Sequence, residues 1–327
     1  MTPDERPRPP VDHELVDRVV MSIYEEPLLC YLGSARLPSR EAIDELVELL
    51  REIVFPGFYG RRGLTHISLP LHVQELLSGV AIRAEEQIRA CLRYRSDVDT
   101  TDADCPESAE CDRMARETTR EFLQFIPELR DLIATDVRAA YDGDPAAHHH
   151  DETIFCYPGV EAIFCHRIAH FLYLHDVPLL PRLIQEGAHT RTGIDIHPGA
   201  QIGRSFFIDH GGGVVIGETA VIGEGCRIYQ GVTLGAKSFA KDDKGVLLRT
   251  GEKRHPTLGN RVTIYAGAVV LGGDTVIGDD CVIAGSVFVT RSVPEGHVVR
   301  QKSPELVLRS NTEIIGVASD DEIPAGG

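Results

Sequence analysis

Residues 194–235 read IDIHPGAQIGRSFFIDHGGGVVIGETAVIGEGCRIYQGVTLG, and an aliphatic residue returns in this stretch at nearly every sixth position. A six-residue period is neither helical nor a simple strand alternation. It is typical of a parallel β-helix, in which three hexads form one triangular coil. The positions that share the step are Ile196, Ile202, Ile208, Ile216, Ile222, Ile228, Leu234, Leu258, Ile264, Val270, Val276, Val282 and Phe288. Leu271, Ile277 and Ile283 offer a second phase, so the sequence leaves open which set points inward there.

The sequence before the repeats has helical periodicity. Apolar residues recur at helical spacing in residues 11–24, 71–94, 114–140 and 159–175. A further helix is expected to begin after Ser39 as its N-cap and to end at Pro56-Gly57. Its apolar stripe consists of Ile43, Leu46, Leu49, Leu50 and Ile53. The acidic stretch 96–110 is expected to be a loop.

The change of period divides the chain and predicts an α+β protein. We expect an N-terminal α-helical domain over residues 1–190, a β-helix over 191–295 and a C-terminal tail over 296–327. Such a solenoid has flat faces that commonly pack as a trimer, with sites in the clefts between subunits.

Composition excludes several classes of protein. Lys and Arg number 33 against 50 Asp and Glu, a net charge of −17, which argues against a nucleic-acid-binding surface. No apolar run approaches the length of a membrane span, and the polar, Pro-rich start MTPDERPRPP is unlike a signal peptide. The eight cysteines form no CxxC pair, which favours free thiols and a cytoplasmic protein over a zinc site.

The first break in the repeats is DHGGG, residues 209–213. A coil that loses register bulges outward, and glycines let the backbone approach a ligand. His210 beside Asp209 is a candidate general base, and Asp195, nearly one coil earlier, is a candidate to hold its imidazole in one tautomer. The residues alone leave open the alternative of an ordinary histidine in a Gly-rich turn.

The second break is AKSFAKDDKGVLLRTGEK, residues 236–253, which holds four of the chain's five lysines. It must leave the solenoid and return at Arg254-His255-Pro256. Long loops of this kind are often lids, and a solvated excursion without a role is the alternative.

The motifs around these breaks resemble the serine O-acetyltransferase family of hexapeptide-repeat acyltransferases. The resemblance rests on GIDIHPGAQIGRSFFIDHGGGVVIGETAVIG, then VTLGA, then RHP, and extends to DVRAAYDGDPAA and GVEAIFCHRIAHFLY upstream. LPSREAIDELVELLREIVFPGFYG resembles the long N-terminal part of one bacterial branch. The family implies a left-handed β-helix and acetyl transfer from acetyl-CoA to L-serine, which gives O-acetylserine for cysteine synthesis.

Site residues follow from the resemblance, motif by motif. His210 matches the family's general base and Asp195 its orienting carboxylate. The residues that match the serine site are Asp144, Asp209, Arg254 and His255. The residues that match the acetyl-CoA groove are Ala236, Lys237, Ala266 and Ala284.

These residue types suit the implied chemistry. A serine hydroxyl needs proton removal as it attacks, whereas a thioester is already activated, so no metal is expected. Direct transfer in a ternary complex is expected because no cysteine falls in the matched motifs of the solenoid. Serine is a zwitterion, and Asp144, Asp209 and Arg254 supply charges for its amine and carboxylate. L-cysteine differs from serine only by sulfur for oxygen, so we expect it to inhibit.

The resemblance also bears on assembly. We expect a homotrimer or a dimer of trimers. The chain ends in EIPAGG and lacks the terminal Ile that relatives insert into O-acetylserine sulfhydrylase, which argues against a complex with that enzyme. HVVRQKSPELVLRS also replaces the short Gly-Val-Pro turn of many relatives.

Other functions remain open on the residues alone. A γ-type carbonic anhydrase would need three histidines converging between subunits, and the solenoid offers His197, His210 and His255. Acetyl transfer to a sugar or an antibiotic and a non-catalytic scaffold are further alternatives. His166 and His170, four residues apart on a helix, would suit zinc only with a third ligand.

Overall fold

The computed structural model describes residues 12–32, 37–96, 106–238, 241–248 and 251–302. The chain forms two compact units: residues 1–133 with 164–188, and residues 134–163 with 189–327. The units cut across the boundary predicted at residue 190, because residues 134–163 pack with the solenoid. Most of the predicted C-terminal tail lies outside the described residues.

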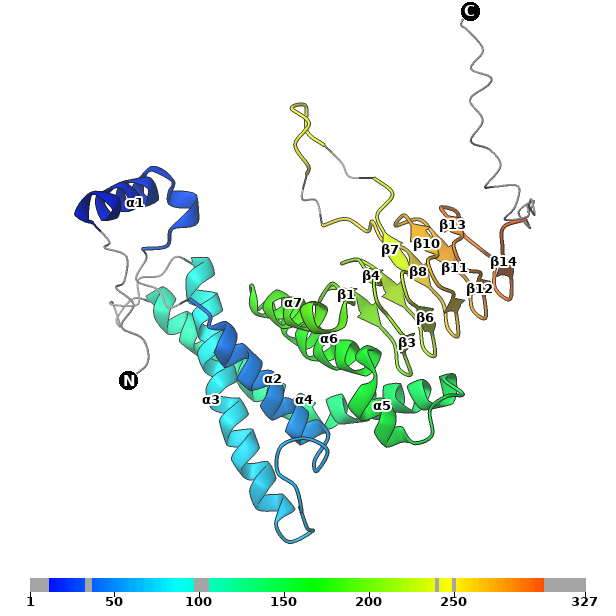
Figure 1. The fold of residues 1–327 in the computed structure, drawn as a ribbon, viewed down its shortest axis with the longest axis horizontal. Helices are drawn as coiled ribbons and strands as arrows, with labels where there is room; N and C mark the ends of the chain where they lie inside the picture. The colour runs from blue at the N-terminus through cyan, green and yellow to red at the C-terminus, as the bar shows by residue number, and fades with distance from the viewer. Residues whose placement is uncertain (1–11, 33–36, 97–105, 239–240, 249–250, 303–327) are drawn as a thin grey trace, which may run out of the picture. The chain divides into compact units, whose positions relative to one another are not determined.

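The helices precede the strands in the chain, as the change of period predicts (Figure 1). They are α1 (His13–Glu25), the 3₁₀ turn η1 (Pro27–Leu29), α2 (Arg40–Val54), α3 (Leu69–Ser96), α4 (Pro106–Gly143), α5 (His150–Cys156), α6 (Pro158–Leu174) and α7 (Leu180–Thr192). Within the described ranges, none of these helices combines the length and the apolar run that crossing a bilayer requires.

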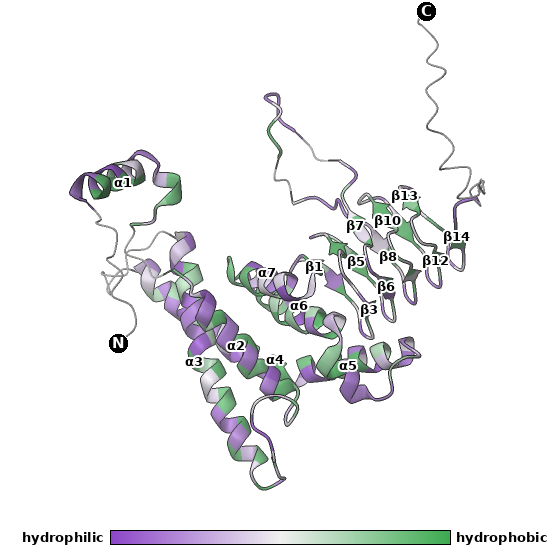
Figure 2. Ribbon diagram, viewed as in Figure 1, coloured by the Kyte–Doolittle hydropathy of each residue, from purple (hydrophilic) through white to green (hydrophobic). Residues whose placement is uncertain are grey.

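Helix α2 has the start and the apolar stripe that its sequence predicts. The Ser39 hydroxyl accepts a hydrogen bond from the Ala42 backbone N–H at 3.2 Å, which is the expected N-cap. The stripe residues Ile43, Leu46, Leu50 and Ile53 are buried, and α2 packs against α3. Figure 2 shows that both helices also carry hydrophilic residues, as partly buried helices do.

The acidic stretch 96–110 is not all loop, so that prediction was wrong at both ends. Helix α3 continues to Ser96 and α4 begins at Pro106, while residues 97–105 lie outside the described residues. Proline has a φ angle that suits the first turn of a helix, and the Glu107 carboxylate is favourable beside the N-terminal dipole.

The strands form a parallel β-solenoid with three faces, which confirms the prediction from the hexads. Face 1 is β1 (Asp195–Ile196), β4 (Val215–Ile216), β7 (Thr233–Gly235), β10 (Val269–Leu271) and β13 (Phe288–Val289). Face 2 is β2 (Gln201–Ile202), β5 (Val221–Ile222), β8 (Thr257–Leu258) and β11 (Val276–Ile277). Face 3 is β3 (Phe207–Asp209), β6 (Arg227–Tyr229), β9 (Thr263–Ile264), β12 (Val282–Ile283) and β14 (Val298–Val299).

The structure determines which hexad phase points inward. Up to Val270, nearly all of the predicted positions are buried. Beyond it the inward residues are Ile277 and Ile283, both 0% exposed, whereas Val276 is 45% exposed. The corner after β10 contains one extra residue, and Gly272 adopts a φ of 106° there, so the second phase takes over.

Residues 134–163 pack against β3 through two glycines. A Cβ at Gly143 would lie 2.6 Å from the Phe207 ring, and one at Gly159 would lie 2.3 Å from the Ile208 carbonyl oxygen. The buried carboxylate of Asp136 accepts a hydrogen bond from the Phe206 N–H at 2.9 Å. This close approach brings the ends of α4 and α5 to the last residue of β3.

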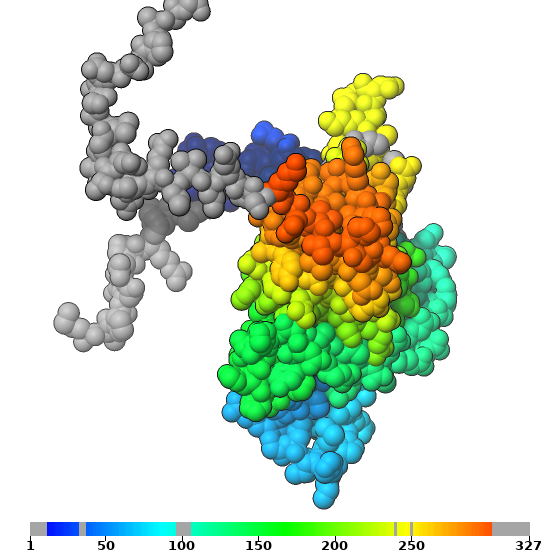
Figure 3. Space-filling model, turned by 90° about the vertical axis from the view of Figure 1, so that its right-hand side faces the viewer, coloured from blue at the N-terminus to red at the C-terminus, as the bar shows by residue number. Residues whose placement is uncertain are grey.

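The second break, between β7 and β8, leaves the solenoid as the sequence predicts. Its described tip is a short hairpin in which Asp242 N–H donates to the Val246 carbonyl at 2.9 Å. In Figure 3 this segment (yellow) projects from the stacked coils. Its apolar residues Val246, Leu247 and Leu248 are exposed.

Candidate active site

Asp144 and Tyr157 form one part of the candidate site. Asp144 directly follows α4, and Tyr157 lies between α5 and α6. One carboxylate oxygen of Asp144 accepts the Ala146 N–H at 2.8 Å, and the other accepts the Tyr157 hydroxyl. The Tyr157 hydrogen bond, followed by that of Ala146, lowers the pKa of Asp144, and the His210 ring is close enough to contribute. Asp144 is therefore held ionised.

His210 sits in a tight turn at the end of β3. The Gly211 N–H donates to the Asp209 carbonyl at 2.6 Å across a three-residue turn, and His210 has a φ of 57°. The same left-handed conformation occurs at other corners of the solenoid, at Ser205, Arg261 and Ser286, so it shapes the turn without marking a site. The His210 side chain is 75% exposed, and its Nε2 lies 3.8 Å from a carboxylate oxygen of Asp209.

Asp195 begins β1, one coil before this turn. Its Cα partner is Val215, which follows the glycines of the break, so Asp195 is at the same corner as His210. The carboxylate within ion-pair distance of the His210 ring is that of Asp209. The orienting role of Asp195 stays a prediction.

Arg254 and its neighbours form a second part of the site, at the corner between faces 1 and 2. The Arg254 guanidinium donates to the Glu218 carboxylate. The Lys253 ammonium donates to the Pro256 carbonyl at 3.2 Å and to the Thr219 carbonyl, and burial lowers its pKa. Two cations thus lie side by side, and only one of them has a carboxylate partner among these contacts.

His255 is 7% exposed and packs onto Gly217. Its Nδ1 lies 3.1 Å from the Thr219 backbone nitrogen and 2.9 Å from the Thr219 hydroxyl. Burial, and then the charge of Arg254, lower the pKa of His255 to about 4. The ring is therefore neutral near pH 7.

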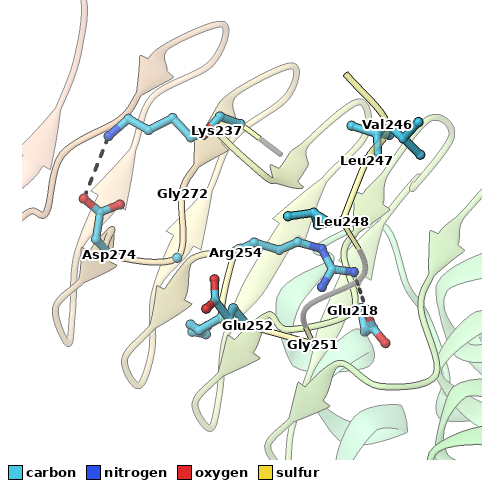
Figure 4. A pocket seen from close by; sticks show the side chains of 13 residues that line it. Glu218, Lys237, Val246, Leu247, Leu248, Gly251, Glu252, Arg254, Gly272 and Asp274 are labelled. Carbon is cyan, nitrogen blue, oxygen red and sulfur yellow. Dashed lines mark hydrogen bonds and ion pairs between the residues drawn. The ribbon is translucent and has the colours of Figure 1, made fainter. Parts of the chain in front are cut away.

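A pocket of about 1180 Å³ lies beside this corner, between the excursion and the coils (Figure 4). Its lining includes Lys237, Arg254 and Leu248. The Lys237 ammonium donates to the Thr290 carbonyl at 3.0 Å and lies 3.9 Å from Asp274. The lining therefore combines cationic and apolar side chains with three carboxylates, those of Glu218, Glu252 and Asp274.

The predicted residues are divided between two corners of the coil. Asp195, Asp209, His210, Ala266 and Ala284 lie at the corner between faces 3 and 1. The corner between faces 1 and 2 holds Ala236, Lys237, Arg254 and His255. We call these two groups of residues half-sites. Within a single chain, face 1 separates them.

Within the described parts of the chain, no three His, Cys, Asp or Glu side chains are arranged to hold an ion. The rings of His166 and His170 stack at a centroid distance of 5.5 Å.

Sequence reasoning missed three residues of the site. Glu218 and Thr219 lie within the stretch GGGVVIGETAVIG that carries the resemblance, but no role was assigned to them, because their partners lie 36 positions away. The spacing of residues in the sequence did not predict a role for Tyr157, because its hydrogen bond to Asp144 depends on how residues 134–163 pack against β3.

Comparisons with known proteins extend over the helices and the solenoid together. No protein-family model matches the chain. The chain is 48% identical over 265 residues to a plasmid serine acetyltransferase of Synechococcus elongatus, covering 81% of this chain and 82% of that protein. It resembles Entamoeba histolytica serine acetyltransferase isoform 3 in complex with cysteine, with a TM-score of 0.67, 32% identity and coverage of 92% and 98%. It also resembles Neisseria gonorrhoeae serine acetyltransferase in complex with serine, with a TM-score of 0.50, 27% identity and coverage of 79% and 95%.

These likenesses reach beyond the repeats that many unrelated enzymes share. An alignment of 265 residues is longer than the solenoid and includes much of the helical part. The predicted left-handed β-helix is the one that these relatives have. By sequence, by fold and by coverage of both chains, this chain belongs to the serine acetyltransferase family.

Proposed function

We propose that the chain transfers the acetyl group of acetyl-CoA directly to the hydroxyl of L-serine, with His210 as the general base. The observation that carries the proposal is the position of His210, exposed on a tight turn beside Asp209 and Asp144. His210 removes the hydroxyl proton as the serine oxygen attacks the thioester carbonyl. The carbon–sulfur bond then breaks, and the proton passes to the CoA sulfur.

The serine ammonium group is assigned to Asp144 and Asp209. Asp144 is supported by its lowered pKa, since an ammonium needs an ionised partner. Asp209 is 15% exposed and extends toward His210, so a serine held by its amine would have its hydroxyl near the imidazole. Asp195 is assigned to stabilise the imidazolium that forms.

The serine carboxylate is assigned to Arg254 and His255. Arg254 offers a planar cation whose hydrogen bond to Glu218 fixes its direction. Because the two half-sites lie at different corners of the coil, one complete site requires the His210 corner of one subunit to meet the Arg254 corner of another. The proposal therefore includes a homotrimer, which the helical part would extend to a dimer of trimers.

Acetyl-CoA is assigned to the pocket beside the excursion. Lys237 suits its phosphates, and Leu248 suits its apolar arm. Ala236, Ala266 and Ala284 would line the rest of the groove, where small side chains leave room for an extended ligand. Ala236 and Lys237 lie at the corner between faces 1 and 2, and Ala266 and Ala284 lie at the corner between faces 3 and 1. The trimer would join these two corners.

L-cysteine is proposed as an inhibitor at the serine site. The Entamoeba histolytica neighbour holds cysteine and the Neisseria gonorrhoeae neighbour holds serine, which supports one pocket for both amino acids. A thiol in place of the hydroxyl leaves the contacts to the amine and the carboxylate unchanged.

The test is release of CoA thiol from acetyl-CoA with and without L-serine. We expect serine-dependent release by the wild type and its loss in His210→Ala. His297→Ala, an exposed histidine on the last described coil, is the matched control and should keep full activity. Serine-independent release, or full activity in His210→Ala, would reject the proposal.

A further inference from the structure

Thr219 is the centre of the hydrogen bonds that receive the chain as it returns from the excursion. Its hydroxyl oxygen accepts the Arg254 N–H at 2.9 Å and the His255 N–H at 3.0 Å. Its carbonyl accepts the Lys253 ammonium. One threonine on the preceding coil thus holds three consecutive residues of the second half-site.

The same threonine determines which nitrogen of His255 carries the proton. A backbone N–H can only donate, and that of Thr219 points at Nδ1 at 3.1 Å, so Nδ1 is an acceptor. The hydroxyl hydrogen is free to donate to Nδ1 as well, at 2.9 Å, because the oxygen accepts from the two N–H groups. A neutral ring with an unprotonated Nδ1 carries its proton on Nε2.

The surroundings of His255 keep the ring neutral and in place. Burial is the main cause of its lowered pKa; Arg254, Lys253 and His197 add to it, and Glu218 opposes it. On the other side of the ring, a Cβ at Gly217 would lie 2.0 Å from Cδ2 and 2.1 Å from Nε2. The ring therefore occupies space that exists only because residue 217 is a glycine.

We propose that Thr219 is a positioning residue that holds His255 with its proton on Nε2, so that His255 offers an N–H donor to an oxygen of the bound acyl acceptor. This inference rests on the proposed function, in which His255 belongs to the serine site. A neutral N–H donor recognises a carboxylate or hydroxyl oxygen without adding a charge beside Arg254.

The first test observes the proton directly. A two-bond ¹H–¹⁵N spectrum of the full-length protein without substrate, assigned with His255→Gln, should show Nδ1 unprotonated and Nε2 protonated. A protonated Nδ1 would overturn the inference. This measurement needs neither activity nor a folded variant at position 219.

The second test separates positioning from packing. Thr219→Val keeps the shape and removes the hydroxyl, and we expect kcat/KM for serine to fall about tenfold with the KM for acetyl-CoA unchanged. Thr219→Ser restores the hydroxyl and should restore both the rate and the Nε2–H spectrum. Thr263→Val on face 3 makes the same change away from the site and should behave as wild type. Equal losses in Thr219→Ser and Thr219→Val, or no loss in either, would contradict the proposal.

The two proposals fail separately. If the wild type releases no thiol with serine, the proposed function fails while the spectrum still reports the tautomer. If the wild type is active with serine but carries the proton on Nδ1, this inference alone fails.

Discussion

Replacing Tyr157 with phenylalanine tests whether Asp144 binds the serine ammonium group. The change removes the hydroxyl that donates to the Asp144 carboxylate and leaves the ring. Asp144 then keeps the Ala146 N–H as its hydrogen-bond donor among the contacts described for it. We expect weaker use of serine, because a less firmly held carboxylate presents a worse partner for an ammonium.

The size of the effect follows from the geometry. A hydrogen bond to a charged group contributes about 1.5–3 kcal/mol. Asp144 is partly exposed, so water replaces part of the lost bond and reduces the effect to about 1–1.5 kcal/mol, at or below the lower end of that range. This corresponds to a fall in kcat/KM for serine of roughly 5- to 12-fold.

The pH profile gives an independent readout of the same change. The Tyr157 hydrogen bond is the largest cause of the lowered pKa of Asp144, so its removal raises that pKa. The carboxylate is then protonated at a higher pH, but an ordinary aspartate is still ionised where a histidine base takes up its proton. The expected signature is therefore a loss of similar size from about pH 6 to about pH 8.

The assay is initial-rate release of CoA thiol, with serine varied at several pH values. Tyr24→Phe makes the same chemical change on the exposed face of α1 and should leave every constant unchanged. An unaltered kcat/KM for serine in Tyr157→Phe, or a change confined to the KM for acetyl-CoA, would refute the assignment of Asp144.

Two further substitutions test the packing behind the site. Gly217→Ala puts a methyl group into the His255 ring, and the displaced ring should lower kcat/KM for serine about 100-fold. Gly79→Ala on α3, where the new methyl meets a flexible leucine at 3.1 Å, is the control, and equal activities in the two variants would contradict the packing argument. Asp136→Ala leaves the buried Phe206 N–H without its acceptor and should cost about 1–3 kcal/mol of unfolding free energy in urea. An unchanged urea midpoint relative to the exposed Asp131→Ala would show that this junction does not stabilise the fold.

Periodicity predicted the architecture because it reports burial directly. The hexads required a triangular coil, and the stripe on α2 required a helix with one buried face. The sequence alone does not show which residues point into the coil after Val270, because Val276-Ile277 and Val282-Ile283 are aliphatic pairs, and either member of each pair could be buried. A single extra corner residue decides between them, and a corner leaves no periodic signal.

The sequence predicted individual residues of the candidate site but not their arrangement in space. Motif resemblance identified His210 and Arg254, but it did not show that a single chain separates them by a face of the coil. The hydrogen bonds of Tyr157 and Thr219 depend on contacts that no spacing rule predicts. The positioning role proposed for Thr219 therefore rests on contacts that only the folded structure reveals.

The excursion between β7 and β8 leaves the coil and rejoins it at one corner. Val221 pairs with Thr257 as though the intervening residues were absent, and Val215 pairs with Thr233 on the face before it. Each doubling of a loop's length costs only about 0.6 kcal/mol of closure entropy. Evolution can therefore lengthen, shorten or exchange this segment without moving any coil, and a protein engineer can graft a new recognition hairpin at the same point.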